Sequence, residues 1–326
     1  MKAFSYATAR SAEEAVDLVR DGGRFLAGGV DLLGEMKDGL AAPTHVVDVK
    51  RLPDLREIAV TAEGGRIGAN VTLAKLAEHA ELRRVLPGLA QAAEEVGSPQ
   101  MRNIATVGGN LAQHSRCWYY RQREVTCAKK GGKRCYARGG ENKYHSLFTG
   151  CMCLSPCTSN LGVALTALGA KVVVQRGRKT VTLTMAELYR AAWETPRAHN
   201  SLREDDLILR VEVPVPPGGA AGAASVYLQM GERRAFDWAL VSCAAAGRVE
   251  GGAWRGVAVA LGCVAPVPWR AEAAEKFLEG KAVSEANAEA AAELIMKDAE
   301  PREQNGYKVP LAKALVKRAL MKLATA

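Results

Sequence analysis

Ala105-Thr-Val-Gly-Gly-Asn-Leu111 opens the segment that decides the fold of this 326-residue chain, and Thr158-Ser-Asn160 closes it. An apolar run over residues 161–170 follows. Between the two ends lie six of the chain's eight cysteines: Cys117, Cys127, Cys135, Cys151, Cys153 and Cys157. Paired glycines can turn backbone amides toward a phosphate, and clustered thiols in a reducing compartment are typical of metal sites. The segment therefore predicts a phosphate-containing cofactor beside a metal centre.

A second glycine turn of the same form lies near the N-terminus, in Phe25-Leu-Ala-Gly-Gly-Val-Asp-Leu32. In both turns an apolar strand end is followed by two glycines and a small or polar residue. Because glycines let the backbone approach a ligand closely, two such turns from different domains can hold a pyrophosphate from both sides. Either turn taken alone is also typical of an ordinary tight turn. Neither matches the Gly-x-Gly-x-x-Gly fingerprint or a P-loop, which excludes those two kinds of nucleotide site.

The pattern of hydrophobic residues and turns predicts an α+β chain with three domains, at residues 1–55, 56–219 and 220–326. The first domain reads as strand, glycine turn, helix and strand, after a helix that Ser11 and Glu14 cap reciprocally. The second contains the cysteine-rich insert at about residues 114–157 and ends in a linker of Pro214, Pro216, Pro217, Gly218 and Gly219.

The third domain is expected to contain a three-stranded antiparallel sheet and helices. Its strands are predicted at residues 226–229, 239–248 and 254–263. Helices are predicted at residues 271–278, 284–297 and 311–323. Cys243 and Cys263 fall on the predicted strands and are interpreted as small core residues.

The composition restricts the class of protein. The net charge is +9, but the basic residues are scattered and few aromatic residues accompany them, so we expect no nucleic-acid partner. No apolar run approaches the roughly 20 residues of a membrane span, and the N-terminus lacks an apolar signal segment. We therefore expect a cytoplasmic protein, in which thiols stay reduced and clustered cysteines bind metal rather than form disulfides.

The two glycine turns together resemble the flavin-binding loops of the molybdenum hydroxylase family, which includes xanthine dehydrogenase, carbon monoxide dehydrogenase and 4-hydroxybenzoyl-CoA reductase. The resemblance extends over essentially the whole chain. It implies the FAD-binding medium subunit, with a two-lobed FAD-binding fold of the PCMH (vanillyl-alcohol oxidase-like) type. The residues that it implies as FAD-binding are Phe25, Leu26, Ala27, Gly28, Gly29, Val30, Asp31, Leu32, Val96, Thr106, Gly108, Gly109, Asn110, Asn160, Ile208 and Gln229.

Two of these positions depart from the pattern of the family. The family usually has an aspartate where this chain has Asn160, and often a lysine where it has Gln229. Loss of both charges can alter the potential of the flavin or its reaction with NAD. The two departures therefore weigh against a pyridine nucleotide as the electron carrier of this chain.

The cysteine-rich insert narrows the resemblance to the 4-hydroxybenzoyl-CoA reductase type, whose medium subunit holds a [4Fe–4S] cluster in such an insert. The resemblance implies Cys117, Cys127, Cys135 and Cys153 as ligands, the last chosen over Cys151 and Cys157. Four thiolates and glycine-rich spacing suit a cluster. Tetrahedral zinc can use the same four thiols, although no Cys-x-x-Cys pair is present, and free thiols are a third possibility. His145 is either structural or a neighbour of the cluster.

The resemblance implies an electron-transfer subunit of a multi-subunit oxidoreductase. Its expected partners are a large subunit with the molybdenum cofactor, a small subunit with [2Fe–2S] clusters, and an external electron carrier such as ferredoxin or NAD. Lys129, Lys130, Lys133 and Arg134 lie between two of the cysteines and are interpreted as a solvated turn or as a docking face for an acidic carrier. The alternatives are a flavin reductase acting alone on its own substrate, and a zinc-stabilised basic binding module.

Overall fold

The computed structural model describes residues 1–61, 64–214, 224–234 and 236–326. Its first sheet contains three parallel strands in the order β1-β3-β2. The strands are β1 (Ser5–Thr8), β2 (Arg24–Leu26) and β3 (His45–Asp48). They are accompanied by α1 (Ala12–Leu18), α2 (Leu32–Lys37) and the 3-10 turn η1 (Pro53–Leu55). The expected strands and helices of this region are present, and β1 is an additional strand at the edge of the sheet.

The second sheet contains five antiparallel strands in the order β4-β5-β8-β6-β7. The strands are β4 (Ile58–Thr61), β5 (Gly64–Gly68), β6 (Lys171–Arg176), β7 (Lys179–Thr184) and β8 (Leu207–Pro214). The helices associated with this sheet are α3 (Leu73–Glu78), α4 (Ala80–Val85), α5 (Pro87–Glu94), α6 (Pro99–Arg102), α7 (Val107–Leu111), α9 (Asn160–Ala167) and α10 (Met185–Glu194).

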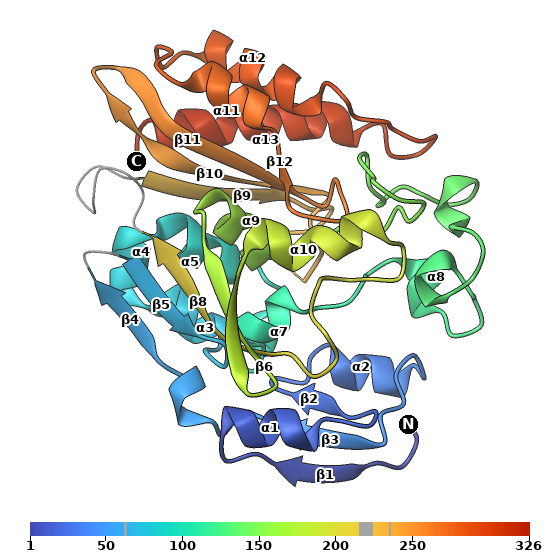
Figure 1. Cartoon of the computed structure of the whole chain (residues 1–326). Helices are drawn as coiled ribbons and strands as arrows, with labels where there is room; N and C mark the ends of the chain where they lie inside the picture. Colours follow the sequence, from blue (N-terminus) through green and yellow to red (C-terminus); the bar gives the residue numbers. More distant parts are fainter. Residues whose placement is uncertain (62–63, 215–223, 235) are drawn as a thin grey trace.

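The cysteine-rich insert leaves this part of the chain after α7 and returns at α9 (Figure 1). Its regular structure is limited to α8 (Trp118–Arg121) and the 3-10 turns η2 (Ala128–Lys130) and η3 (Tyr136–Arg138). In Figure 1 it forms a lobe beside the strands and helices of the two larger sheets.

The third sheet is antiparallel and has four strands in the order β12-β11-β10-β9, so the expectation of three strands was wrong. The strands are β9 (Ala224–Met230), β10 (Val241–Glu250), β11 (Ala253–Gly262) and β12 (Trp269–Arg270). The additional strand β12 is two residues long and pairs with Ala260 and Leu261, which is too short to produce an alternating pattern in the sequence. The helices α11 (Glu272–Leu278), α12 (Glu285–Met296) and α13 (Lys308–Leu323) follow.

Two hydrophobic cores hold the larger sheets together. One joins the five-stranded sheet to α3, α5 and α9 and reaches the near face of the four-stranded sheet. The other fills the space between the opposite face of that sheet and α11, α12 and α13, which cover it in Figure 1. The chain is therefore α+β, as expected.

The division into three domains stays a prediction. The three sheets fall in turn within residues 5–48, 58–214 and 224–270. Of the predicted linker, Pro214 is the last residue of β8, and the part from Pro216 to Gly219 lies outside the described residues. Among the helices of the described residues, none combines the length and apolar character that crossing a membrane requires.

Candidate functional site

A cavity of about 820 Å³ lies where the two glycine turns meet. Twelve of the sixteen residues expected to bind FAD line it: Phe25, Ala27, Gly28, Gly29, Val30, Asp31, Leu32, Val96, Thr106, Gly109, Asn110 and Asn160. The structure thus brings residues from the first sheet, α7 and α9 to one cavity.

The two turns are in direct contact through Gly28. A Cβ atom on this residue would lie 2.0 Å from the carbonyl oxygen of Ile104, which directly precedes the second turn. Gly29 has a φ of +74°, a conformation that glycine adopts without strain. In the second turn Thr106 caps α7 by accepting a hydrogen bond from the amide of Gly109 at 3.2 Å. The glycines therefore serve close backbone approach in the first turn and a helix start in the second.

The other four expected residues do not line the cavity. Leu26 is half-buried on β2, and Ile208 is buried in the core on β8. Gly108 donates a backbone hydrogen bond to Ala69 at 2.8 Å and so packs against the second sheet. Gln229 accepts a hydrogen bond from Nδ2 of Asn160 at 2.8 Å. The two positions expected to depart from the family pattern therefore contact each other through their uncharged amides.

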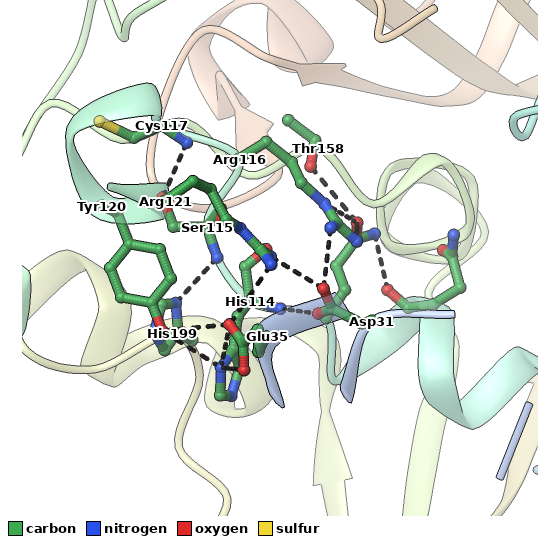
Figure 2. A network of polar contacts seen from close by, with 12 residues as sticks. Asp31, Glu35, His114, Ser115, Arg116, Cys117, Tyr120, Arg121, Thr158 and His199 are labelled. Atoms are coloured by element: carbon green, nitrogen blue, oxygen red, sulfur yellow. Dashed lines mark hydrogen bonds and ion pairs between the residues drawn. The ribbon is translucent and has the colours of Figure 1, made fainter. Parts of the chain in front are cut away.

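Asp31 connects the first glycine turn to the cysteine-rich insert (Figure 2). Its Oδ1 lies 2.8 Å from the guanidinium groups of both Arg116 and Arg121, and its Oδ2 accepts from the amide of His114 at 2.7 Å. Burial alone would raise the pKa of Asp31, but the two arginines and the amide outweigh it and hold the pKa below its usual value. Asp31 is therefore an ionised anchor for the start of the insert.

A second set of contacts surrounds the buried carboxylate of Glu35, next to Asp31 in Figure 2. It contacts Nδ1 of His114 at 3.0 Å and accepts from the hydroxyl of Tyr120 at 3.2 Å. The ring of His114 stacks on that of His199 with 4.1 Å between centroids. Burial, with nearby cations, lowers the pKa of His199 well below its usual value, so that ring is neutral at pH 7.

The insert contains a separate, small cavity that cysteine side chains surround. All four cysteines expected to bind the cluster line it: Cys117, Cys127, Cys135 and Cys153. Neither Cys151 nor Cys157 lines this cavity. Burial raises the pKa of Cys117 to about 12 and that of Cys153 to about 11, so both thiols are protonated unless a metal replaces the proton.

Within the described residues, no three or more Cys, His, Asp or Glu side chains lie close enough together to hold a single metal ion. His145 contacts one of the cavity cysteines, with its Nε2 3.1 Å from Sγ of Cys117. Burial, followed by the charge of Lys308, lowers the pKa of His145 to about 4, so its imidazole is neutral.

The two cavities are adjacent. Tyr120 lines both of them, and its hydroxyl donates to the carboxylate of Glu35. A third cavity lies between them and shares Ser115 and Lys129 with the cysteine cavity, and His114 and His199 with the large cavity. A molecule in the large cavity and a metal group among the cysteines would therefore be separated by little more than one layer of side chains.

Comparison with known families agrees with this geometry. Residues 2–216 match the family described as "FAD binding domain in molybdopterin dehydrogenase". The chain belongs to this family. Residues 226–323 match the family described as "CO dehydrogenase flavoprotein C-terminal domain". The protein is thus an FAD-binding subunit of a molybdenum hydroxylase-type oxidoreductase, with FAD as a cofactor.

Individual relatives resemble this FAD-binding subunit over nearly its whole length. The aldehyde oxidoreductase FAD-binding subunit PaoB of Escherichia coli (strain K12) is 36% identical over 319 residues, which cover 96% of each chain. The carbon monoxide dehydrogenase medium chain of Hydrogenophaga pseudoflava is 29% identical, covering 97% of this chain and 96% of that one.

Solved structures resemble it equally completely. A chain of quinoline 2-oxidoreductase from Pseudomonas putida 86 has a TM-score of 0.77 and 25% identity, covering 100% of this chain and 99% of that one. A chain of the carbon monoxide dehydrogenase from Hydrogenophaga pseudoflava has a TM-score of 0.77 and 28% identity, covering 99% and 97%.

Sequence reasoning missed several polar residues around the large cavity of this FAD-binding subunit: Glu35, Arg121, Tyr120 and His199. Glu35 is charged yet buried on α2, but burial of a charge is not visible in a sequence. His199 follows α10, a helix that was not predicted although Thr184 and Glu187 form its capping box.

Proposed function

We propose that this chain is the FAD and [4Fe–4S] electron-transfer subunit of a molybdenum hydroxylase-type oxidoreductase, of the 4-hydroxybenzoyl-CoA reductase type. The observation that carries the proposal is the placement of Cys117, Cys127, Cys135 and Cys153 around one cavity beside the large cavity. These thiols come from three parts of the insert that are separated in sequence. Four converging thiols next to a flavin site are what a one-electron relay requires.

The large cavity suits a dinucleotide. Its volume of about 820 Å³ lies within the range of roughly 300–1,000 Å³ that ligand sites occupy. In the first glycine turn, the backbone amides that follow Gly28 can supply donors for a pyrophosphate at a place where side chains are small. Bound FAD accepts electrons in pairs and passes them on singly, and the chain sets its orientation and surroundings.

A cluster suits the cysteines better than a single zinc ion. Each thiolate of a cubane binds a different iron, so the four sulfurs stand farther apart than the ligands of one tetrahedral ion. Among the described residues, no three Cys, His, Asp or Glu side chains lie close enough to hold one ion, which weighs against a single zinc ion. Cys151 and Cys157 remain outside the proposed ligand set.

The proposal places this subunit between other redox partners. The names of relatives, "medium chain" and "FAD-binding subunit", are those of parts of larger enzymes. We therefore propose a large subunit with the molybdenum cofactor and a small subunit with [2Fe–2S] clusters as its partners. On the other side, we propose an external carrier such as ferredoxin, in preference to NAD because Asn160 and Gln229 stand where the family carries charges.

The test is anaerobic purification of the chain with whatever subunits accompany it, followed by analysis of FAD, iron, sulfide and molybdenum. We expect one FAD and four irons from this chain beyond those of the partners. Cys127→Ser should lower iron and sulfide and leave FAD in place. Cys151→Ser, which removes a cysteine outside the cavity, is the matched control and should keep full iron. Full iron in Cys127→Ser, or zinc in place of iron, would overturn the proposal.

A further inference from the structure

We propose that His145 donates a hydrogen bond from Nε2 to the sulfur of Cys117 and thereby raises the reduction potential of the cluster. This inference rests on the proposed function, since it requires a cluster bound by Cys117. It assigns a tuning role to a residue that is not itself a ligand.

The contact is short and enclosed. Nε2 of His145 lies 3.1 Å from Sγ of Cys117, within hydrogen-bond distance for sulfur. The side chain of His145 is buried, and the rings of Trp118 and Tyr119 lie 5.5 and 6.1 Å from it, centroid to centroid. Its other ring nitrogen, Nδ1, finds no hydrogen-bond partner among the described residues. Among the described residues, Sγ of Cys117 is therefore the one hydrogen-bond partner of the imidazole ring of His145.

The backbone of His145 is held from two sides. Its amide donates to the carbonyl of Asn142 at 2.9 Å. Its carbonyl accepts from Nδ2 of Asn305 at 3.2 Å and from Nζ of Lys308 at 3.1 Å; both residues are buried, Asn305 just before α13 and Lys308 at its first position. The C-terminal helix thus fixes the position of the histidine in the insert. Such support is typical of residues that orient a metal site from outside its ligand shell.

The direction of the hydrogen bond follows from the ligand. A thiolate bound to iron has no proton, so the proton between the two atoms must belong to Nε2 of His145. The reduced cluster carries one more negative charge than the oxidised one, and a donor to its sulfur stabilises that form more strongly. Hydrogen bonds to cluster sulfurs are one of the factors that set the potential. Removing the donor should therefore shift the potential to a more negative value.

The experiment compares His145→Phe with His145→Gln in the co-purified assembly. Phenylalanine keeps a ring of similar size without a donor, whereas glutamine keeps an N–H. Redox titration followed by EPR should give a more negative cluster potential for His145→Phe and a potential near the wild-type value for His145→Gln. Equal potentials in wild type and His145→Phe, with full iron in both, would overturn the inference. Absence of a cluster in the wild type would instead overturn the proposed function.

Electron–nuclear double resonance of the reduced wild type tests the inference even if both variants lose the cluster. With histidine labelled by ¹⁵N, we expect a weak nitrogen coupling and an exchangeable proton that disappears in D₂O. Absence of both signals would contradict the hydrogen bond. A strong nitrogen coupling would make His145 an iron ligand and would equally refute a tuning role.

Discussion

A single residue, Gly28, makes the contact between the two glycine turns possible. Its missing side chain leaves room for the backbone of Ile104 and Ala105, so the first turn can lie directly against the second. Gly34, on α2, has no such neighbour: nothing lies within 4 Å of where its Cβ would be. The two glycines therefore differ in what surrounds them, although both follow the same strand.

We predict that Gly28→Ala weakens FAD binding and destabilises the protein by about 1–3 kcal/mol, because the new methyl group would meet a backbone carbonyl that has little room to move. Gly34→Ala is the control and should stabilise α2 by about 0.5–1 kcal/mol. Fluorescence titration with FAD and urea unfolding measure the two effects. Equal FAD affinity in both variants would mean that the turns do not need this contact.

Single residues also show where sequence reasoning ends. The two glycine turns can be predicted from the sequence, since few residues other than glycine allow such turns. The role of Asp31 as the anchor of Arg116 and Arg121 was not predicted, because those arginines lie on the insert, far along the chain. Ion pairs between distant segments depend on the tertiary fold and leave no local pattern.

At the scale of an element, Asn110 stabilises the start of α9, although the two lie about fifty residues apart in the sequence. Its Oδ1 accepts from the hydroxyl of Ser159 at 2.7 Å and from the amide of Leu161 at 3.2 Å. Ser159 in turn accepts from the amide of Gly162 at 2.9 Å and so caps the helix. A residue expected to face FAD therefore also holds the helix that carries Asn160.

We predict that Asn110→Ala lowers the free energy of unfolding by about 1–3 kcal/mol even after FAD has been removed, because it leaves buried donors on α9 unpaired. Asn287→Ala, which removes a more exposed amide near the start of α12, should cost less than about 0.5 kcal/mol. Urea unfolding of both FAD-free variants is the measurement. If Asn110→Ala lowered the free energy of unfolding as little as the control does, Asn110 would not stabilise α9 in the absence of FAD.

Elements with strong local signals were predicted well. Ser11 caps α1 as expected, and the carboxylate of Glu14 reaches back to accept from the amide of Arg10 at 2.6 Å. Pro87 begins α5 directly after α4, as is typical of proline at the first position of a helix. The strand β12 was not predicted, because two residues are too few to show an alternation of apolar and polar side chains. Its pairing with β11 exists only in the folded sheet.

The whole molecule carries a net charge of +9, and its basic loop in the insert is exposed only in part. Lys129 is buried and donates to the carbonyl of Ala198 at 2.7 Å, and Lys130 donates to that of Gln122. Lys133 and Arg134 are exposed. The docking face proposed for an acidic carrier is therefore reduced to these two residues, and Lys129 instead fastens the insert to the segment after α10.

We predict that Lys133→Gln combined with Arg134→Gln slows reduction of, or by, an acidic ferredoxin roughly three- to ten-fold at low salt, because charges at the rim of an interface act mainly on the rate of association. The control, Arg318→Gln combined with Lys322→Gln, removes the same charge from exposed positions on α13. Stopped-flow kinetics over a range of salt concentrations separate a local docking face from the overall charge. If both double variants slow the reaction equally, the net charge of the chain attracts the carrier, and the insert provides no specific docking face. If only the first pair does, and the difference vanishes at high salt, the carrier meets this chain beside the cysteines.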